Sequence, residues 1–349
     1  MLILVFCWML PALSVAGEQR EFAYQQQKMG TIFQLLIYCD DAKTADDAAE
    51  AAWNRVDQLN NVFSDYDPGS ELSQLSRRTD AGPMTEPVDV SDDMWELLCK
   101  AVEAAQASDG AFDITVGPLS KLQRQSKKDG KLPDPRKLKE ALACIGWRYI
   151  KLDREHHRVH LMHAGMQLDV GGIAKGYTSD QVLKLLNHRG ITRALCGSAG
   201  DITVGDPPPA RKDWRVAIQS LKDPQQISDH VQFRNYAVST SGDTYRSATI
   251  NGKRYSHIID PRTGLSLTFR IGVTTLAPSG TTADWSATAV SILGPKKGLE
   301  MIERLDGAAA RIVTIDDAGT ETLYESQRFP QYLLPHDSPA SAPATNPLH

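Results

Sequence analysis

Several common signatures are missing from this sequence of 349 residues. The five cysteines are dispersed, without the C-x-x-C spacing that zinc ribbons and thioredoxin-like redox sites require. Neither the Walker pattern G-x-x-x-x-G-K-[ST] nor the dinucleotide pattern G-x-G-x-x-G occurs. Lysine and arginine number 38 against 43 aspartates and glutamates, and the net charge of −5 gives no sign of a nucleic-acid surface. No nucleic-acid partner is expected, and a small ligand is favoured.

Long apolar runs are also absent. The longest run lies within residues 1–16 and has about ten residues, whereas a helix that crosses a bilayer needs about twenty. Ser14 and Ala16 place small residues at positions −3 and −1 of a cleavage site before Gly17. The pattern predicts a signal peptide over residues 1–16 and export of the chain. No lysine or arginine precedes the run, so an uncleaved anchor is the alternative.

The remaining chain predicts one α+β domain over residues 24–334, built from mixed β-sheets with packed helices. Strand-like and helix-like segments do not alternate regularly, which disfavours a doubly wound fold. No linker rich in Pro, Gly or Ser divides the chain. Residues 335–349 have frequent prolines and little to bury, which predicts a disordered tail.

Apolar periodicity predicts three helices. The first is expected from Thr44, as N-cap, to Phe63; the second opens at Ser91 and ends before Asp109-Gly110; the third covers residues 175–187. Strands are predicted at 31–40, 194–196, 214–219, 237–239, 271–276 and 311–315. The basic segment 121–139 is interpreted as a solvated surface insertion.

Two segments combine glycine or helical spacing with charge. In LDVGGIAKGYTSD, Asp169 precedes a glycine pair and Lys175 stands at the start of a helix, which is typical of phosphate binding but also of an ordinary glycine turn. In TTADWSATAVSILG, a helix capped by Thr281 or Thr282 and stopped by Gly294 would place Asp284 and Thr288 on one face. These two side chains could hold Mg²⁺, or Asp284 could serve the helix N-terminus alone.

Histidines are the other candidates for chemistry. His257 lies in YSHIIDPRTG, where a turn at Asp260-Pro261 follows a strand-like run. It is either a loop residue or a base. In HHRVHLMH, His157 and His163 are expected on one strand face, but no carboxylate cluster accompanies them, so a metal site there is disfavoured.

Seven blocks in order resemble the ApbE family, the periplasmic flavin transferases that move FMN from FAD to a threonine of an acceptor protein. They cover residues 29–315 and are MGT, FSDYDPGSELSQL, GAFDITVGPL, LDVGGIAKGY, VSTSGDTYR, YSHIIDPRTG and ADWSAT. The resemblance implies an ApbE-like flavin transferase fold, FAD as substrate, Mg²⁺ as cofactor and a periplasmic location. It also implies an acceptor protein in a membrane electron-transport complex.

The resemblance implies site residues as well. FAD would be held at Met29, Tyr66, Ala111, Phe112, Asp113, Asp169, Lys175 and Ile258; Mg²⁺ would be held by the carbonyl of Gly172 and the side chains of Asp284 and Thr288; and His257 would accept the threonine proton.

Two positions depart from the family pattern. Ala199 replaces a glycine, and Trp285 replaces a small residue after the metal aspartate. A positive φ at Ala199 would be strained.

Two other activities are open as well. The same site residues could serve an FAD pyrophosphatase, in which water replaces threonine, or an FAD-binding protein without chemistry. The acid-base and metal residues argue against the last of these.

Overall fold

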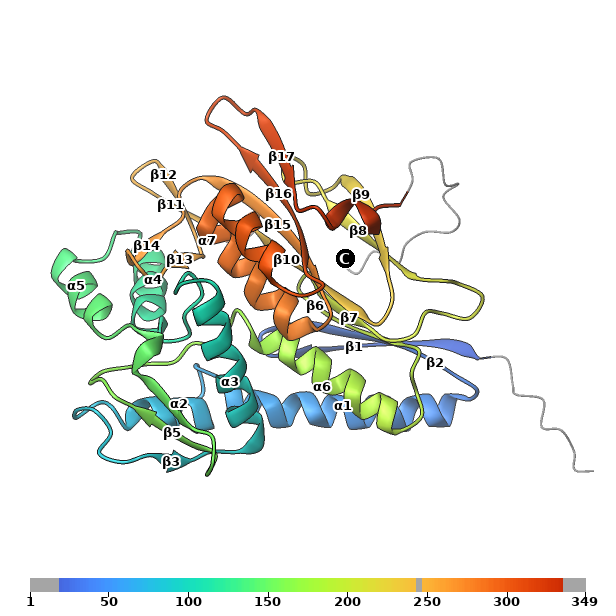
Figure 1. The fold of residues 1–349 in the computed structure, drawn as a ribbon, viewed down its shortest axis with the longest axis horizontal. Coiled ribbons are helices and arrows are strands. Elements are labelled where there is room, and N and C mark those ends of the chain that lie inside the picture. Colours follow the sequence, from blue (N-terminus) through green and yellow to red (C-terminus); the bar gives the residue numbers. More distant parts are fainter. Residues whose placement is uncertain (1–18, 243–246, 335–349) are drawn as a thin grey trace, which may run out of the picture.

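The computed structural model describes residues 19–242 and 247–334, which form one mixed helix and sheet architecture (Figure 1). This confirms the predicted α+β class. The predicted signal peptide and the predicted tail lie outside the described residues. In the described part of the chain, no helix has the length and apolar content needed to cross a bilayer.

An eight-stranded sheet forms the centre of the molecule, and each of its neighbouring strands is antiparallel. In spatial order its strands are β1 (Arg20–Lys28), β2 (Thr31–Cys39), β6 (Ala194–Ser198), β7 (Asp201–Val204), β10 (Tyr236–Gly242), β15 (Arg270–Ala277), β16 (Ala309–Ile315) and β17 (Glu321–Glu325). All six predicted strands are present, five of them in this sheet and the sixth at residues 214–219 in a hairpin beside it.

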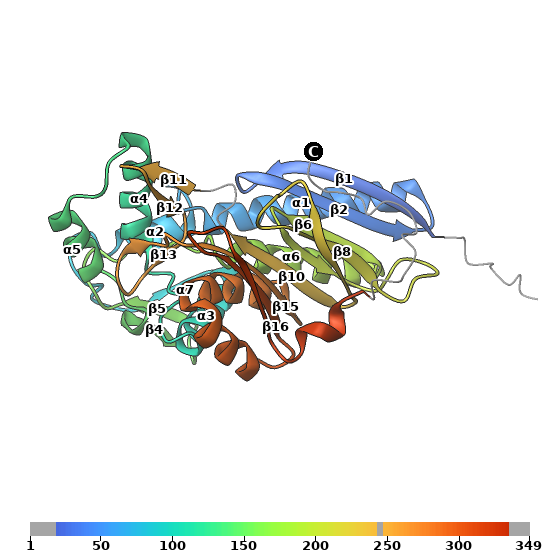
Figure 2. The same ribbon diagram turned by 90° about the horizontal axis from the view of Figure 1, so that it is seen from above.

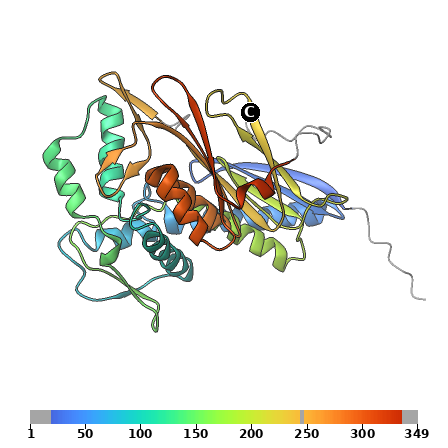
Figure 3. The ribbon, with the colours of Figure 1, turned by 45° about the horizontal axis from the view of Figure 1, so that its top comes forward.

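Helices cover one face of the sheet and a hairpin covers the other. In β2, the alternating residues Phe33, Leu35 and Ile37 are fully buried against α1 (Ala42–Phe63). The intervening Leu36 and Tyr38 pack towards the hairpin of β8 (Trp214–Gln219) and β9 (Ile227–Phe233). Helices α6 (Ala174–His188) and α7 (Gly280–Arg304) lie on the α1 side (Figure 3).

Smaller elements complete the fold. They are α2 (Glu71–Arg77), α3 (Asp92–Ala107), β3 (Val88–Asp89), β4 (Ile150–Asp153), β5 (Arg158–Leu161), α4 (Gly117–Asp129), α5 (Pro135–Ala143), β11 (Ser247–Ile250), β12 (Lys253–Ser256), β13 (Ile259–Asp260), β14 (Leu265–Ser266), η1 (Trp147–Tyr149) and η2 (Phe329–Tyr332). Figure 2 shows α4, α5 and β11 at one end of the molecule and the outer part of β1 and β2 at the other.

The helix caps differ partly from the prediction. Ser91 caps α3 as expected, but α1 begins after Asp41, whose carboxylate accepts hydrogen bonds from both N and Oγ1 of Thr44. Helix α7 is capped by Ser279 rather than by Thr281 or Thr282. In both corrected cases the cap lies two or three residues earlier, because an upstream polar side chain reaches the free N–H groups first.

Two other expectations are corrected and one is confirmed. The basic segment 121–139 is mostly helical, since it contains most of α4 and the start of α5, and its Leu122 and Leu138 pack against the buried cluster that includes Leu119. Strand β5 is only four residues long, so His157, with φ of 53°, and His163 lie beyond its two ends. The predicted stop at Gly294 is confirmed: its φ of 71° and ψ of −178° are not helical and end the first segment of α7, and a second helical segment, which shares the label α7, follows and runs to Arg304.

Candidate functional site

A cleft of about 2930 Å³ gathers all the site residues expected from the sequence. It is lined by Met29, Tyr66, Ala111, Phe112, Asp113, Asp169, Gly172, Lys175, His257, Ile258, Asp284 and Thr288. Pockets for drug-sized ligands have roughly 300–1,000 Å³. The cleft therefore has room for a dinucleotide and for part of a second molecule.

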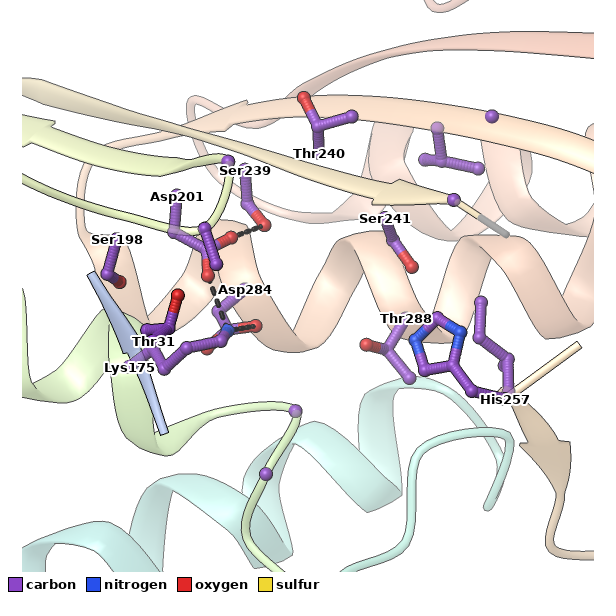
Figure 4. Close-up of a pocket in the computed structure, with 18 of the residues that line it drawn as sticks. Thr31, Lys175, Ser198, Asp201, Ser239, Thr240, Ser241, His257, Asp284 and Thr288 are labelled. Carbon is purple, nitrogen blue, oxygen red and sulfur yellow. Dashed lines mark hydrogen bonds and ion pairs between the residues drawn. The ribbon is translucent and has the colours of Figure 1, made fainter. Parts of the chain in front are cut away.

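Three charged residues of the cleft, Lys175, Asp201 and Asp284, form one row, drawn in Figure 4. Lys175, in the first turn of α6, contacts the carboxylate of Asp201 at the start of β7, and its Nζ lies 3.4 Å from both carboxylate oxygens of Asp284 on α7. Ser239 on β10 donates a further hydrogen bond to Asp201. Two largely buried carboxylates thus face one ammonium group, which leaves a net negative charge at this part of the cleft.

Burial and the excess of carboxylates over ammonium groups shift the pKa values of Asp284 and Lys175. Burial raises the pKa of Asp284 to about 7, Asp201 adds to the rise, and Lys175 opposes it. Burial alone would lower the pKa of Lys175, but Asp201 and Asp284 outweigh it and hold that pKa above its ordinary value. Lys175 is therefore a fixed positive charge, and Asp284 lacks a full counter-charge.

Close backbone contact between α6 and α7 sets this geometry. A Cβ added to Gly176 would lie 2.1 Å from the carbonyl oxygen of Gly280, and one added to Gly280 would lie 2.7 Å from that of Gly176. Only two glycines permit this approach. The N–H of Gly176 also donates to Asp284 at 3.0 Å. The two helix starts therefore hold Lys175 and Asp284 against each other.

The oxygen atoms beside this row fit a hard cation. Thr288 lies one helical turn after Asp284 on α7, and a Cβ added to Gly172 would lie 3.2 Å from Thr288 Oγ1. Carboxylate, hydroxyl and carbonyl oxygens are the ligands that Mg²⁺ prefers. The uncompensated negative charge of the row also favours a divalent cation. Among the described residues, no three or more His, Cys, Asp or Glu side chains are grouped so that they could hold a metal ion by themselves.

The turn formed by Ala111, Phe112 and Asp113 is held by Asp113 itself. This carboxylate is buried and accepts hydrogen bonds from N and Oγ1 of Thr115 and from the N–H of Trp147. Burial raises its pKa. Both of its oxygens accept hydrogen bonds within the protein, so Asp113 holds the shape of this part of the cleft wall.

Asp169 is more accessible than Asp113. It is half-buried, and its Oδ1 accepts a hydrogen bond from the N–H of Gly171 at 2.9 Å. The other predicted FAD residues differ in exposure: Tyr66 is 77% exposed, whereas Ile258 is buried. Met29 stands in the β1–β2 turn with φ of 46°.

His257 lies in the exposed bend between β12 and β13. In Figure 4 its ring is drawn beside Thr288 and Ser241, at the other end of the view from Lys175. The imidazole therefore belongs to the accessible part of the cleft, and the charged row belongs to the buried part.

The two departures from the family pattern have structural outcomes. Ala199 has φ of 48°, the strained conformation expected if this position needs a positive φ, and it costs on the order of 1 kcal/mol. Trp285 is buried and its ring lies 6.2 Å from that of Phe112. It packs beneath the cleft.

Sequence reasoning missed Asp201 and Ser239 as site residues. Asp201 belongs to the segment CGSAGDITVG, where a charged residue between two apolar strand-like runs was the available signal. Ser239 lies in VSTSGDTYR, one of the seven blocks that resemble the family, but a serine in a strand is common and does not by itself indicate a site. The pairing of β7 with β10 brings Ser239 to Asp201, and Asp201 in turn contacts Lys175.

Comparison with known proteins adds independent findings. The ApbE family model matches residues 29–312. FAD:protein FMN transferases from Haemophilus influenzae and Treponema pallidum are 30% and 32% identical to the chain; the first alignment covers 88% of this chain and 91% of the relative, and the second covers 85% of each.

Solved structures agree with this. The flavin transferase ApbE from Vibrio cholerae superposes with a TM-score of 0.80 at 26% identity, covering 90% of this chain and all of that one. The Pseudomonas stutzeri flavinyl transferase ApbE superposes with a TM-score of 0.77 at 27% identity, covering 90% of this chain and 97% of that one. These matches confirm the predicted resemblance, fold and enzyme class, and the chain is a transferase that belongs to the ApbE family.

Proposed function

We propose that this chain is a Mg²⁺-dependent FAD:protein FMN transferase that attaches FMN to a threonine of an acceptor protein and releases AMP. The names of its relatives support the transfer of FMN from FAD to a protein. The observation that carries the proposal is the buried row, in which Lys175 and an oxygen set suited to Mg²⁺ line the same cleft. A pyrophosphate is the ligand that such a pair of positive charges would bind.

The proposed reaction is a phosphoryl-group displacement. The threonine oxygen forms a bond to the FMN phosphorus, the bond from that phosphorus to the bridging oxygen breaks, and AMP departs with that oxygen. Such a reaction needs positioning and neutralisation of charge. Asp284, Thr288 and the carbonyl of Gly172 would hold Mg²⁺, which when bound supplies Lewis acidity to phosphate oxygens. Lys175 adds a fixed positive charge that Asp201 orients.

His257 is proposed to accept the threonine proton. An imidazole can take up a proton near neutral pH, and the exposed position of this residue lets a hydroxyl on another protein reach it. A buried base would be reached by water or small substrates only. The acceptor is proposed to be a component of a membrane electron-transport complex, and the transferase to work in the periplasm.

The deciding experiment uses the protein with FAD, Mg²⁺ and the acceptor domain of a flavinylated electron-transport protein. Transfer predicts flavin fluorescence on the acceptor band after denaturation, and an acceptor whose target threonine is replaced by valine is the control. Release of free FMN and AMP without labelling would instead indicate an FAD pyrophosphatase. Binding of FAD with no product would indicate a carrier.

A further inference from the structure

Arg124 on α4 makes two contacts with the loop that follows α1. Its guanidinium carbon lies 4.5 Å from the centre of the Tyr66 ring, and its Nη2 donates to Oδ2 of Asp65 at 2.7 Å. All three residues line the cleft. Nearly sixty positions of sequence separate Arg124 from this pair, so the contact joins two distant elements at the cleft wall.

The backbone of this loop is fixed by its own hydrogen bonds. Ser64 Oγ accepts from the N–H groups of Tyr66 and Asp67, and Ser70 donates to the carbonyl of Ser64. These bonds leave the side-chain torsions of Tyr66 undetermined. Because the residue is 77% exposed, its ring lacks the packing that fixes a core aromatic.

Arg124 supplies the missing restraint. A planar guanidinium can stack on an aromatic ring while its N–H groups bind a carboxylate. Asp65 is well suited as the anchor: its side chain is only 17% exposed, and Arg124 is the counter-charge that opposes the rise in its pKa caused by burial and the nearby Asp169. Arg124 is thereby held by its hydrogen bond to Asp65, and its guanidinium lies over the ring of Tyr66. One face of the Tyr66 ring is covered, and most of its remaining surface is accessible.

We propose that Arg124 is a positioning residue that presents the open face of Tyr66 to the flavin ring of FAD. The inference rests on the proposed function, because it takes the isoalloxazine ring as the stacking partner. An aromatic ring ordered in advance binds more tightly, since less side-chain freedom is lost on binding. Loss of the restraint should weaken binding of the flavin ring by about threefold to tenfold.

The test separates the two halves of FAD. Riboflavin carries the flavin ring without phosphate, and ADP carries the adenosine and pyrophosphate without the flavin. We expect Arg124→Gln to weaken riboflavin binding by about threefold to tenfold and to leave ADP binding unchanged. Arg124→Lys should show the same loss, because an ammonium group can pair with Asp65 but cannot stack as a plane.

A matched control and a double variant make the test specific. Lys127→Gln removes a positive charge one turn further along α4, from an exposed residue that lines the same cleft, and should leave riboflavin binding unchanged. Tyr66→Ala should weaken riboflavin binding, and Tyr66→Ala with Arg124→Gln should be no weaker than Tyr66→Ala alone. Such non-additivity shows that Arg124 acts through Tyr66.

Several results would overturn the proposal. Equal losses of riboflavin and ADP binding in Arg124→Gln would indicate a structural role, and additive losses in the double variant would indicate that Arg124 contacts the ligand directly. Unchanged riboflavin binding in either Arg124→Gln or Tyr66→Ala would contradict it as well. The proposed function is judged separately, by wild-type transfer of FMN to the acceptor.

Discussion

At the scale of single residues, the cleft separates two tasks by depth. Lys175 and Asp284 are largely buried, with side chains 19% and 6% exposed, so their charges are screened less by water than those of surface residues. His257 lies at the exposed part, where proton transfer with a hydroxyl of another protein is possible. Changes at the two depths should therefore affect different steps.

Replacing His257 by alanine should reduce the rate of transfer far more than the affinity for FAD. The change removes the proposed proton acceptor, whose loss typically lowers a rate by about 10²- to 10⁴-fold. The dissociation constant of FAD, followed by flavin fluorescence, should change less than about tenfold, because the charged row is untouched. An equally severe loss of FAD binding would make His257 a ligand contact instead of a base.

Replacing Asp284 by asparagine should nearly abolish Mg²⁺-dependent turnover without lowering thermal stability. Asparagine keeps an oxygen for the N–H of Gly176, and loss of one carboxylate relieves the charge imbalance around Lys175. Thr288→Ala should be milder, since water can replace a neutral ligand. Turnover measured across a Mg²⁺ titration and a melting curve test this; full activity of Asp284→Asn at limiting Mg²⁺ would refute the metal site.

At the scale of elements, the starts of α6 and α7 form the rigid part of the site. Asp180 on α6 accepts hydrogen bonds from the N–H groups of Gly280 and Thr281, which joins α6 to the first turn of α7. Together with the glycine contact, this fixes the separation of the two helices. The junction thereby sets the distance between Lys175 and Asp284.

Replacing Gly176 by alanine should therefore damage stability and activity together. Its new methyl group would lie 2.1 Å from a backbone oxygen, so one helix start must move, and we expect a loss of about 2 kcal/mol or more in the free energy of unfolding. Gly190→Ala is the control: its φ of 82° makes alanine strained, yet no atom lies within 4 Å of the added Cβ. Denaturant unfolding and turnover should show that only Gly176→Ala impairs the site beyond its effect on stability.

Elements with regular apolar spacing were predictable, and those that depend on partners were not. Helix α3 has its cap, periodicity and stop in its own sequence. Helices α4 and α5 carry many exposed lysines and arginines, and their few apolar residues form a helix pair only when both pack together. In the site, Asp284 and Thr288 follow from helical spacing, whereas Asp201 depends on strand pairing that no local pattern encodes.

At the scale of the whole molecule, the site is assembled from the full length of the domain. Met29 comes from the first strand turn, Lys175 from the middle and Asp284 from the last long helix. The cleft also receives residues from α4 and β12, at the end of the molecule opposite the start of β1 (Figure 2). The predicted division of the chain into a leader, one domain over 24–334 and a tail stays a prediction, and this interdependence agrees with a single domain.

The predicted export of the chain can be tested by the N-terminus and the intact mass of the protein. If residues 1–16 are a cleaved signal peptide, protein from the periplasmic fraction should begin at Gly17, and its intact mass should lack the first sixteen residues. A full-length mass in the membrane fraction would indicate an uncleaved anchor. Replacing Ala16 by a bulky residue should block cleavage and serve as the control.

The glycine pair at the junction of α6 and α7 also limits how this enzyme can change over evolutionary time. Most active-site distances can drift by small steps, because one side chain can be exchanged for a slightly larger or smaller one. Between Gly176 and Gly280 the spacing is set by backbone against backbone, and no smaller residue exists. Lineages that diverge in acceptor preference are therefore expected to vary the exposed rim of the cleft while this junction stays fixed.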